Sequence, residues 1–127
     1  MPKFIAILIM LAFAKGSSAQ GVVGKDMAWI SLAEAEKAAG KAPRPVLIDL
    51  YTDWCGWCKQ MDKKTYKNEK VIRYLQDKYY SVKLDAETKQ SMYWKGKEYK
   101  FNGQYKTNEI ALFFTGGQLS YPTTVII

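Results

Sequence analysis

The residues of this chain best suited to chemistry are Cys55 and Cys58, which are separated by Gly56 and Trp57. They are the only two cysteines among 127 residues. If a helix begins at this pair, the first sulfur lies where free backbone N–H groups and the helix dipole favour a thiolate. The second sulfur then lies one turn further along, on the same side of the helix. The spacing therefore predicts a pair that closes and reopens a disulfide bond, as thiol–disulfide exchange requires.

The segments on either side of the pair predict a strand followed by a helix. Val46–Tyr51 reads VLIDLY, an apolar run broken by one acid, which is typical of a strand buried on both faces. A helix is expected from Cys55 to about Lys64. On this arrangement we expect Cys55 alone to be exposed, at the helix start, and to alkylate faster than Cys58.

Other uses of two cysteines fit the chain less well. A buried inert pair is one alternative. Zinc takes about four ligands, and the chain has no histidine, so a zinc site would have to be shared between two copies. Covalent haem attachment needs a histidine after the second cysteine, where Lys59 stands. We therefore expect no metal and no bound cofactor.

The remaining pattern predicts one α/β domain. Alternating strands and helices favour parallel strands joined by helical crossovers. The expected elements are a helix from the Ser31–Glu34 capping box to Gly40, a helix capped by Asn68, a strand over residues 79–84, a hairpin over residues 92–101, a helix capped by Thr107 or Asn108 that ends at Gly116, and a strand over residues 123–127. The Met92–Tyr105 region is expected either to contact a partner or only to cover the sheet edge.

Three stretches carry a resemblance to a known family. They read VLIDLYTDWCGWCK, KQMDKKTYKNEKVIRYLQDKYYSVKLDAE and SYPTTVII. This chain resembles the thioredoxin superfamily, and more narrowly the secreted thioredoxin-like proteins of Gram-negative bacteria with a WCGWC site. The resemblance implies a thioredoxin-like α/β fold. Such proteins continue with an antiparallel strand and a last helix after the strand that follows Pro122, so we expect the domain over residues 20–127 to be incomplete.

The same resemblance suggests roles for the residues of the motif. Cys55 is the expected nucleophile, and Cys58 is the thiol that resolves a mixed disulfide with a client protein. Gly56 would let a client backbone approach closely. Trp57 stands where thioredoxin has proline. Because the chain has no histidine in this gap, a reductant is favoured over an oxidant.

Asp49 stands where the thioredoxin pattern has a buried acid. A carboxyl group in an apolar strand has a raised pKa, and it could accept the proton of Cys58. The alternative is a strand residue that is hydrogen-bonded to backbone. Lys83 either pairs with Asp49, as a similar lysine does in the family, or is an ordinary exposed lysine.

The Tyr121–Pro122 step matches the cis-proline loop of the family. The loop is expected to face Cys55, and the backbone of Tyr121 to pair with an extended client. A trans proline that starts a strand is the alternative. Trp54 and Trp57 are expected to form an apolar rim for clients, although ordinary packing is a competing interpretation, more so for Trp54.

The first residues predict export. Residues 1–19 combine a basic start, an apolar run from Phe4 to Ala14 and small residues at Ser17 and Ala19, which is typical of a signal peptide cleaved before Gln20. The apolar run is too short for a membrane anchor. We therefore expect a periplasmic or secreted protein without stable membrane insertion.

The formal net charge is +7, which raises the question of nucleic acid binding. Export argues against it, and a solvated helix face explains the charge better. The basic residues that follow the motif are Lys59, Lys63, Lys64, Lys67 and Lys70.

The sequence thus predicts a thiol–disulfide oxidoreductase that reduces or isomerises disulfides of exported clients. Its electrons would come from a membrane or periplasmic donor. The alternative is a client-binding or chaperone-like module with little turnover.

Overall fold

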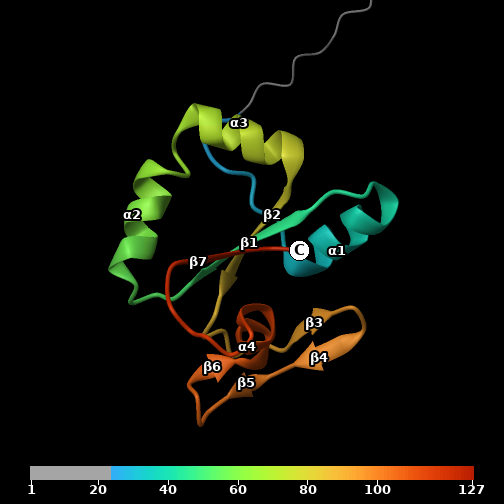
Figure 1. Ribbon diagram of the computed structural model, residues 1–127, viewed down its shortest axis with the longest axis vertical. Helices are drawn as coiled ribbons and strands as arrows, with labels where there is room; N and C mark the ends of the chain where they lie inside the picture. The colour runs from blue at the N-terminus through green and yellow to red at the C-terminus, as the bar shows by residue number, and fades with distance from the viewer. Residues whose placement is uncertain (1–23) are drawn as a thin grey trace, which may run out of the picture.

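The computed structural model describes residues 24–127, so the expected signal peptide over residues 1–19 lies outside the described residues. The elements in chain order are α1 (Leu32–Lys41), β1 (Val46–Tyr51), α2 (Gly56–Lys64), α3 (Glu69–Lys78), β2 (Tyr80–Asp85), β3 (Met92–Trp94), β4 (Lys97–Tyr99), β5 (Phe101–Asn102), β6 (Thr107–Asn108), α4 (Glu109–Thr115) and β7 (Thr123–Ile126). Figure 1 shows β3–β6 gathered with α4 on one side of the central strands.

The central sheet has the strand order β2-β1-β7. β1 pairs with β2 in parallel, as expected, and Asp49 lies opposite Lys83 in this register. β7 pairs with β1 in the antiparallel direction, so the expectation that all strands run parallel is wrong for this strand. The reason lies in the connection, because the chain turns back after α4 and enters β7 through the Tyr121–Pro122 loop.

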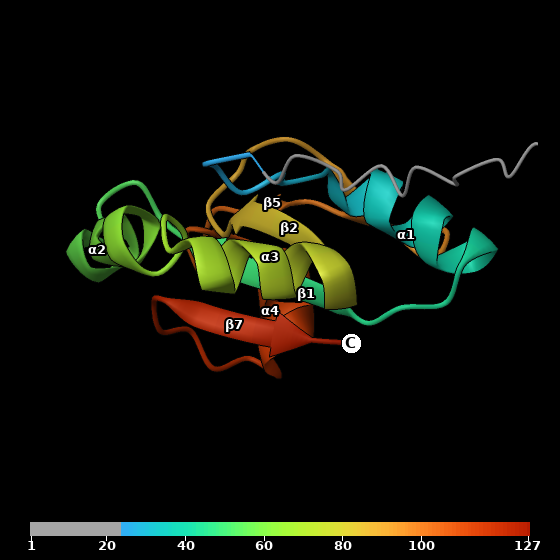
Figure 2. The same ribbon diagram turned by 90° about the horizontal axis from the view of Figure 1, so that it is seen from above.

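Alternation along β1 divides the core between the two faces of the sheet. Val46, Ile48 and Leu50 pack with α1, α4 and the hairpin strands in the larger apolar cluster. Leu47 faces the other way and packs with Tyr66 and the apolar side of α3. Figures 1 and 2 both place α1 and α2 toward opposite ends of β1. Asp49 shares the face of Leu47, so it points to the side that α2 and α3 cover.

The helix caps agree with the sequence analysis. Ser31 and Glu34 form the expected capping box of α1, in which each side chain accepts a hydrogen bond from the backbone N–H of the other residue. Asn68 caps α3 and Asn108 caps α4. The expected end of α1 at Gly40 is one residue early. The helix continues to Lys41 because an exposed glycine is tolerated, and it ends where Ala42, which precedes Pro43, is extended.

The segment between β2 and α4 contains more pairing than expected. The predicted hairpin is present, as β3 and β4 pair around Lys95 and Gly96. A second small pair, β5 with β6, was not predicted because each strand has only two residues. Trp94 and Tyr99 of the first hairpin are buried in the larger apolar cluster. The hairpin therefore covers part of the core.

Candidate active site

The cysteine pair lies at the junction between β1 and α2. Cys55 is the N-cap of α2, and its Sγ accepts a hydrogen bond of 3.1 Å from the backbone N–H of Cys58. Cys55 and Cys58 form a disulfide bond, with Cα atoms 5.3 Å apart. The predicted strand, helix start and pairing of the sulfurs are confirmed. Such an N-cap position favours a thiolate on Cys55 once the bond is reduced.

The expectation that only Cys55 is exposed is wrong for this disulfide form. Cys55 is 4% exposed and Cys58 is 3% exposed. The bond turns the two sulfur atoms toward each other, and the cap geometry turns Cys55 Sγ back over the first turn of α2. The two sulfurs therefore differ in their neighbours rather than in their exposure.

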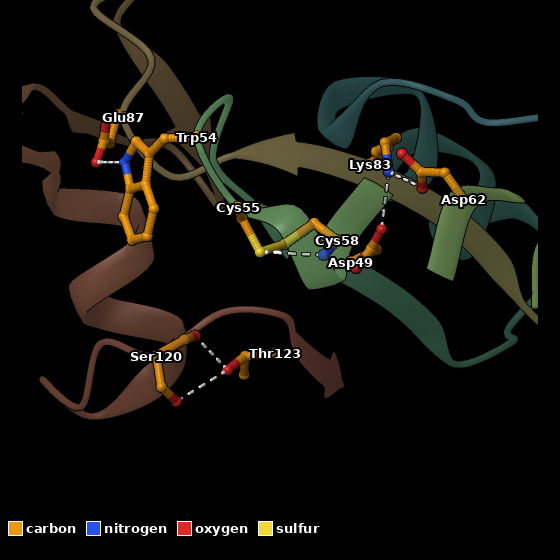
Figure 3. The surroundings of a disulfide bond; sticks show 9 residues. All are labelled: Asp49, Trp54, Cys55, Cys58, Asp62, Lys83, Glu87, Ser120 and Thr123. Atoms are coloured by element: carbon orange, nitrogen blue, oxygen red, sulfur yellow. Dashed lines mark hydrogen bonds and ion pairs between the residues drawn. A yellow bond between two sulfur atoms is a disulfide. The ribbon is translucent and has the colours of Figure 1, made fainter. Parts of the chain in front are cut away.

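The loop before β7 approaches the pair from the Cys55 side. The Tyr121–Pro122 peptide bond is cis, as the resemblance predicted. The hydroxyl of Thr123 donates a 2.6 Å hydrogen bond to the backbone carbonyl of Ser120 across this turn. Figure 3 shows Ser120 and Thr123 on the side of Cys55, and Asp49 with Lys83 on the side of Cys58. Each cysteine thus has its own set of neighbours.

The two tryptophans of the motif are both exposed. Trp57 is 76% exposed and borders a shallow groove that Pro122 and Met61 also line. Trp54 is 67% exposed, yet its indole N–H donates a 2.8 Å hydrogen bond to Glu87, and its ring stands edge-on to that of Tyr121. Trp54 therefore combines both interpretations, since it is anchored by packing and still presents an apolar face.

Gly56 has open space where a side chain would begin. A Cβ atom built at this residue meets no atom of residues 24–127 within 4 Å, and its backbone is not in the left-handed region. The protein itself therefore does not require glycine here. The open space leaves room for another molecule beside the disulfide.

Asp49 is buried on the Cys58 side of the pair and is bound to Lys83 (Figure 3). Its side chain is 2% exposed, and Oδ2 lies 3.0 Å from the Lys83 ammonium. Within residues 24–127, Oδ1 has no hydrogen-bond partner. Burial raises the pKa of Asp49 above its ordinary value, and the hydrogen bond from Lys83 only partly opposes this. Asp49 is therefore an acid that holds its proton more readily than a surface aspartate.

Lys83 joins Asp49 to a second carboxylate. Its ammonium lies 2.5 Å from Oδ1 of Asp62, which is partly exposed on α2. Burial opposes the positive charge, but the hydrogen bonds to Asp62 and Asp49 outweigh it and raise the pKa of Lys83. The rings of Tyr51, Trp29 and Tyr66 lie 4.7–5.9 Å from the same ammonium and favour the cation further. The alternative of an ordinary exposed lysine is wrong.

Sequence reasoning missed two residues of this site. Asp62 follows Cys58 by four positions on one helix, so helical spacing was a usable signal that both face the same side. Glu87 binds Trp54 across 33 positions, and no local pattern indicates such a contact. The first residue could have been found from the sequence, whereas the second depends on the tertiary structure.

The lysines after the motif form no enclosed site. All five are exposed, and Lys67 pairs with Asp26. Lys59, Lys63 and Lys64 lie on α2, whereas Lys67 lies in the turn after it and Lys70 on α3, so the five do not share one helix as expected. In the part of the chain that the structure describes, no cluster of three or more His, Cys, Asp or Glu side chains is placed to hold a metal ion. Between residues 24 and 127, no helix combines the length and apolar character needed to cross a membrane.

Comparison with known proteins gives curated relatives that match only part of their own length. A thiol:disulfide interchange protein DsbD of Pectobacterium atrosepticum is 40% identical over 45 residues, which are 35% of this chain and 8% of that protein. The DsbD of Ralstonia nicotianae is 40% identical over 60 residues, or 46% of this chain and 10% of its own length. Human spermatogenesis-associated protein 20 is 33% identical over 54 residues, which are 42% of this chain and 7% of that protein.

A solved structure named DsbH Oxidoreductase has a similar fold, with a TM-score of 0.59 at 19% sequence identity. The match covers 90% of this chain and 76% of the other, and it confirms the thioredoxin-like α/β fold. The family Thioredox_DsbH, described as "Protein of unknown function, DUF255", matches residues 17–96. Since that match spans more than half of the chain, this protein belongs to the Thioredox_DsbH family.

Proposed function

We propose that this protein is a thiol–disulfide oxidoreductase that reduces or isomerises disulfide bonds of exported client proteins. The observation that carries the proposal is the Cys55–Cys58 disulfide at the start of α2, where a backbone N–H already points at Cys55 Sγ. The names of the relatives support it, since DsbD is called a thiol:disulfide interchange protein and the structural neighbour an oxidoreductase.

The reaction begins from the reduced pair. The Cys55 thiolate attacks one sulfur of the client disulfide, forms a mixed disulfide and expels the other client sulfur as a thiolate, which takes a proton. The thiolate of Cys58 then attacks Cys55 Sγ and expels the second client sulfur. The client gains two electrons and two protons, and the protein is left with the Cys55–Cys58 disulfide.

Asp49 has the surroundings of a base for the second step. Cys58 must lose its proton before it attacks, and both Cys58 and Asp49 are buried away from bulk water. Oδ1 of Asp49, which has no hydrogen-bond partner among the described residues, is an acceptor for that proton, while Lys83 holds Oδ2. Asp62 binds the same lysine and is partly exposed, so it offers the proton a route toward solvent.

The client would bind across the surface around Cys55. The backbone of Tyr121 is the expected partner of an extended client segment. Trp54 and Trp57 flank the disulfide with exposed rings, and Gly56 leaves the space between them open. These features support a binding surface that is apolar and accessible from one side.

We place this reaction in the periplasm or outside the cell. The proposal rests on the expected signal peptide over residues 1–19, with cleavage before Gln20. A spent Cys55–Cys58 disulfide must be reduced again, so a membrane or periplasmic dithiol donor is required. No bound cofactor takes part in the steps described.

Reduction of insulin by dithiothreitol, with and without the protein, tests the activity. We expect the protein to accelerate precipitation of the insulin B chain, and Cys55→Ser to abolish the acceleration. The exposed Trp54 and Trp57 also suit a client-binding module with little turnover. That second candidate is favoured if the protein binds insulin and keeps it soluble, while the wild type and Cys55→Ser both leave the reduction rate at the value of dithiothreitol alone.

A further inference from the structure

A cavity of about 270 Å³ lies beside Trp54, away from the groove of Trp57. Its walls come from four separate parts of the chain. The active-site loop contributes Trp54, the segment after β2 contributes Glu87, and the loop before β7 contributes Leu119 and Tyr121. The turn between β5 and β6 closes the cavity with Tyr105 and Lys106.

Hydrogen bonds on both sides fix the β5–β6 turn that carries Tyr105. The hydroxyl of Thr107 and the backbone N–H of Asn108 both donate to the carbonyl of Ala86, at 2.8 and 2.7 Å. Both residues are buried. On the other side of the turn, the Asn102 side chain accepts hydrogen bonds from the backbone N–H groups of Gln104 and Tyr105. The turn is therefore fixed to the segment that also carries Glu87.

Trp54 is held by the same segment. Glu87 accepts the indole hydrogen bond at 2.8 Å, and the ring of Tyr121 stands edge-on to Trp54 with centroids 5.9 Å apart. Trp54 is thus the shared wall between the cysteine pair and the cavity. A group bound in the cavity lies next to the loop that positions Cys55.

We propose that this cavity binds an aromatic side chain of the client, next to the cysteine that Cys55 attacks, and that Tyr105 determines this preference. The inference rests on the proposed function and names part of its specificity. Three rings line the cavity, namely those of Trp54, Tyr105 and Tyr121, and aromatic rings attract one another in edge-on or offset geometry. Tyr105 is 59% exposed, so it has apolar surface left to bury against a client.

The position of Tyr121 links the cavity to the cysteine pair. Tyr121 lines the cavity, while its neighbour Pro122 lines the groove beside Trp57. A client strand that pairs with the backbone of Tyr121 points successive side chains to alternate sides. One side chain can then enter the cavity while the cysteine faces Cys55. Lys106 at the rim adds a cation that favours the face of an aromatic ring.

The test uses short peptides with a cysteine–glutathione mixed disulfide. The peptides differ only at the residue before or the residue after the cysteine. Phenylalanine, alanine or glutamate is placed at one of these two positions at a time. The second-order rate constant of their reduction by the full reduced chain is measured for the wild type, Tyr105→Ala and Tyr93→Ala. Tyr93 is the matched control, since it is 56% exposed on β3 and does not line the cavity. Reduction of a small aromatic-free disulfide, cystamine, reports the cysteine chemistry alone.

We expect the wild type to prefer phenylalanine over alanine by about 3- to 10-fold, the range of one aromatic contact. Tyr105→Ala should reduce the preference below about 2-fold and leave cystamine reduction unchanged, and Tyr93→Ala should keep the preference. Equal rates for phenylalanine and alanine in the wild type, or a preference that survives Tyr105→Ala, would overturn the inference. A preference for glutamate would also overturn it, because Lys106 would then select an acidic side chain.

A second measurement separates this inference from the proposed function. The same peptides, with serine in place of cysteine, are titrated while the tryptophan fluorescence or NMR signals of the protein are followed. Tighter binding of the phenylalanine peptide that is lost in Tyr105→Ala supports the cavity even if no disulfide is reduced. Absence of any such difference contradicts the inference, whatever the redox activity.

Discussion

Cys55 and Cys58 are almost equally buried, yet their sulfur atoms have different neighbours. Cys55 Sγ accepts the N–H of Cys58 at the helix start. In Figure 3 the buried carboxyl group of Asp49 lies on the side of Cys58. The first environment stabilises a thiolate, and the second offers an acceptor for a proton. On the proposed mechanism, charge and hydrogen bonding separate the roles of the two cysteines.

A first prediction concerns trapping of clients. Cys58→Ser should accumulate a mixed disulfide between Cys55 and a client, because the thiol that resolves it is missing. Non-reducing electrophoresis and mass spectrometry of the trapped species identify the linked cysteine. Equal trapping by Cys55→Ser would contradict the assignment of the two roles.

Asp49→Asn should slow release of the client from the mixed disulfide. An amide cannot accept the proton of Cys58, and loss of a positioned base costs about 10²-fold or more in rate. Stopped-flow measurement of the second step, with Asp77→Asn as an exposed control on α3, checks this. The deficit should shrink as pH rises toward the pKa of a free thiol. The same rate in both variants at pH 7 would rule out Asp49 as the base.

The raised pKa of Asp49 also predicts a pH dependence of stability. Between the ordinary pKa of aspartate, about 3.9, and the raised value, the folded state holds a proton that the unfolded state has released. The free energy of unfolding therefore falls as pH rises through this window.

Asp49→Asn removes that fall, so the variant should be the more stable protein at neutral pH, by a few degrees in melting temperature. Thermal melts from pH 4 to pH 8 measure the difference, with Asp77→Asn expected to follow the wild type. A lower melting temperature for Asp49→Asn at pH 7 would mean that the Lys83 ion pair outweighs the burial of the charge.

At the scale of elements, two asparagine caps have the same chemistry and different surroundings. Asn68 caps α3 at the surface by accepting from the N–H groups of Lys70 and Val71. Asn108 caps α4 inside the protein and is fully buried. Its amide also donates to the carbonyls of Thr88 and Gln90. Asn108 therefore ties α4 to the loop that carries Glu87.

Replacing these caps by alanine should give unequal losses. We expect Asn68→Ala to lower the free energy of unfolding by about 1 kcal/mol, the usual value of a cap. Asn108→Ala should cost about 3 kcal/mol, because it also leaves two carbonyl oxygens without their donors. Urea unfolding of both variants measures the difference. Similar losses would show that the buried amide contributes no more than a surface cap.

The two strand pairs between β2 and α4 differ in what their side chains contact. Trp94 of β3 and Tyr99 of β4 pack into the core, so this hairpin contributes to the stability of the fold. The turn between β5 and β6 instead places exposed Tyr105 beside Trp54. The β3–β4 hairpin therefore covers part of the core, whereas contact of the β5–β6 turn with a partner stays a prediction.

For the protein as a whole, we predict export after cleavage of a signal peptide. We expect a mature N-terminus at Gln20, because Ser17 and Ala19 suit a signal peptidase site. Mass spectrometry of the protein from the periplasm or the medium would give this mass. An unprocessed chain that begins at Met1 and fractionates with the cytoplasm would contradict the proposed location and its electron donor.

Features that depend on neighbours along the chain could be predicted from the sequence alone. Capping residues act on N–H groups two or three positions away, so Ser31 and Asn68 could be assigned from spacing, and the cap of α4 could be narrowed to Thr107 or Asn108. The same holds for Cys55 and Cys58, whose separation of three residues brings the sulfurs together on any helix start. The cis bond before Pro122 followed from resemblance, since composition alone favours the trans form.

The features that join distant parts of the chain depend on the tertiary structure. The antiparallel direction of β7 depends on the path of the chain after α4, which no local pattern encodes. The contacts of Lys83 with Asp62 and of Trp54 with Glu87 bridge 21 and 33 positions. The raised pKa of Asp49 depends on how completely other elements exclude water from it. Spacing therefore determined the reactive pair, and packing determined the environment in which the pair reacts.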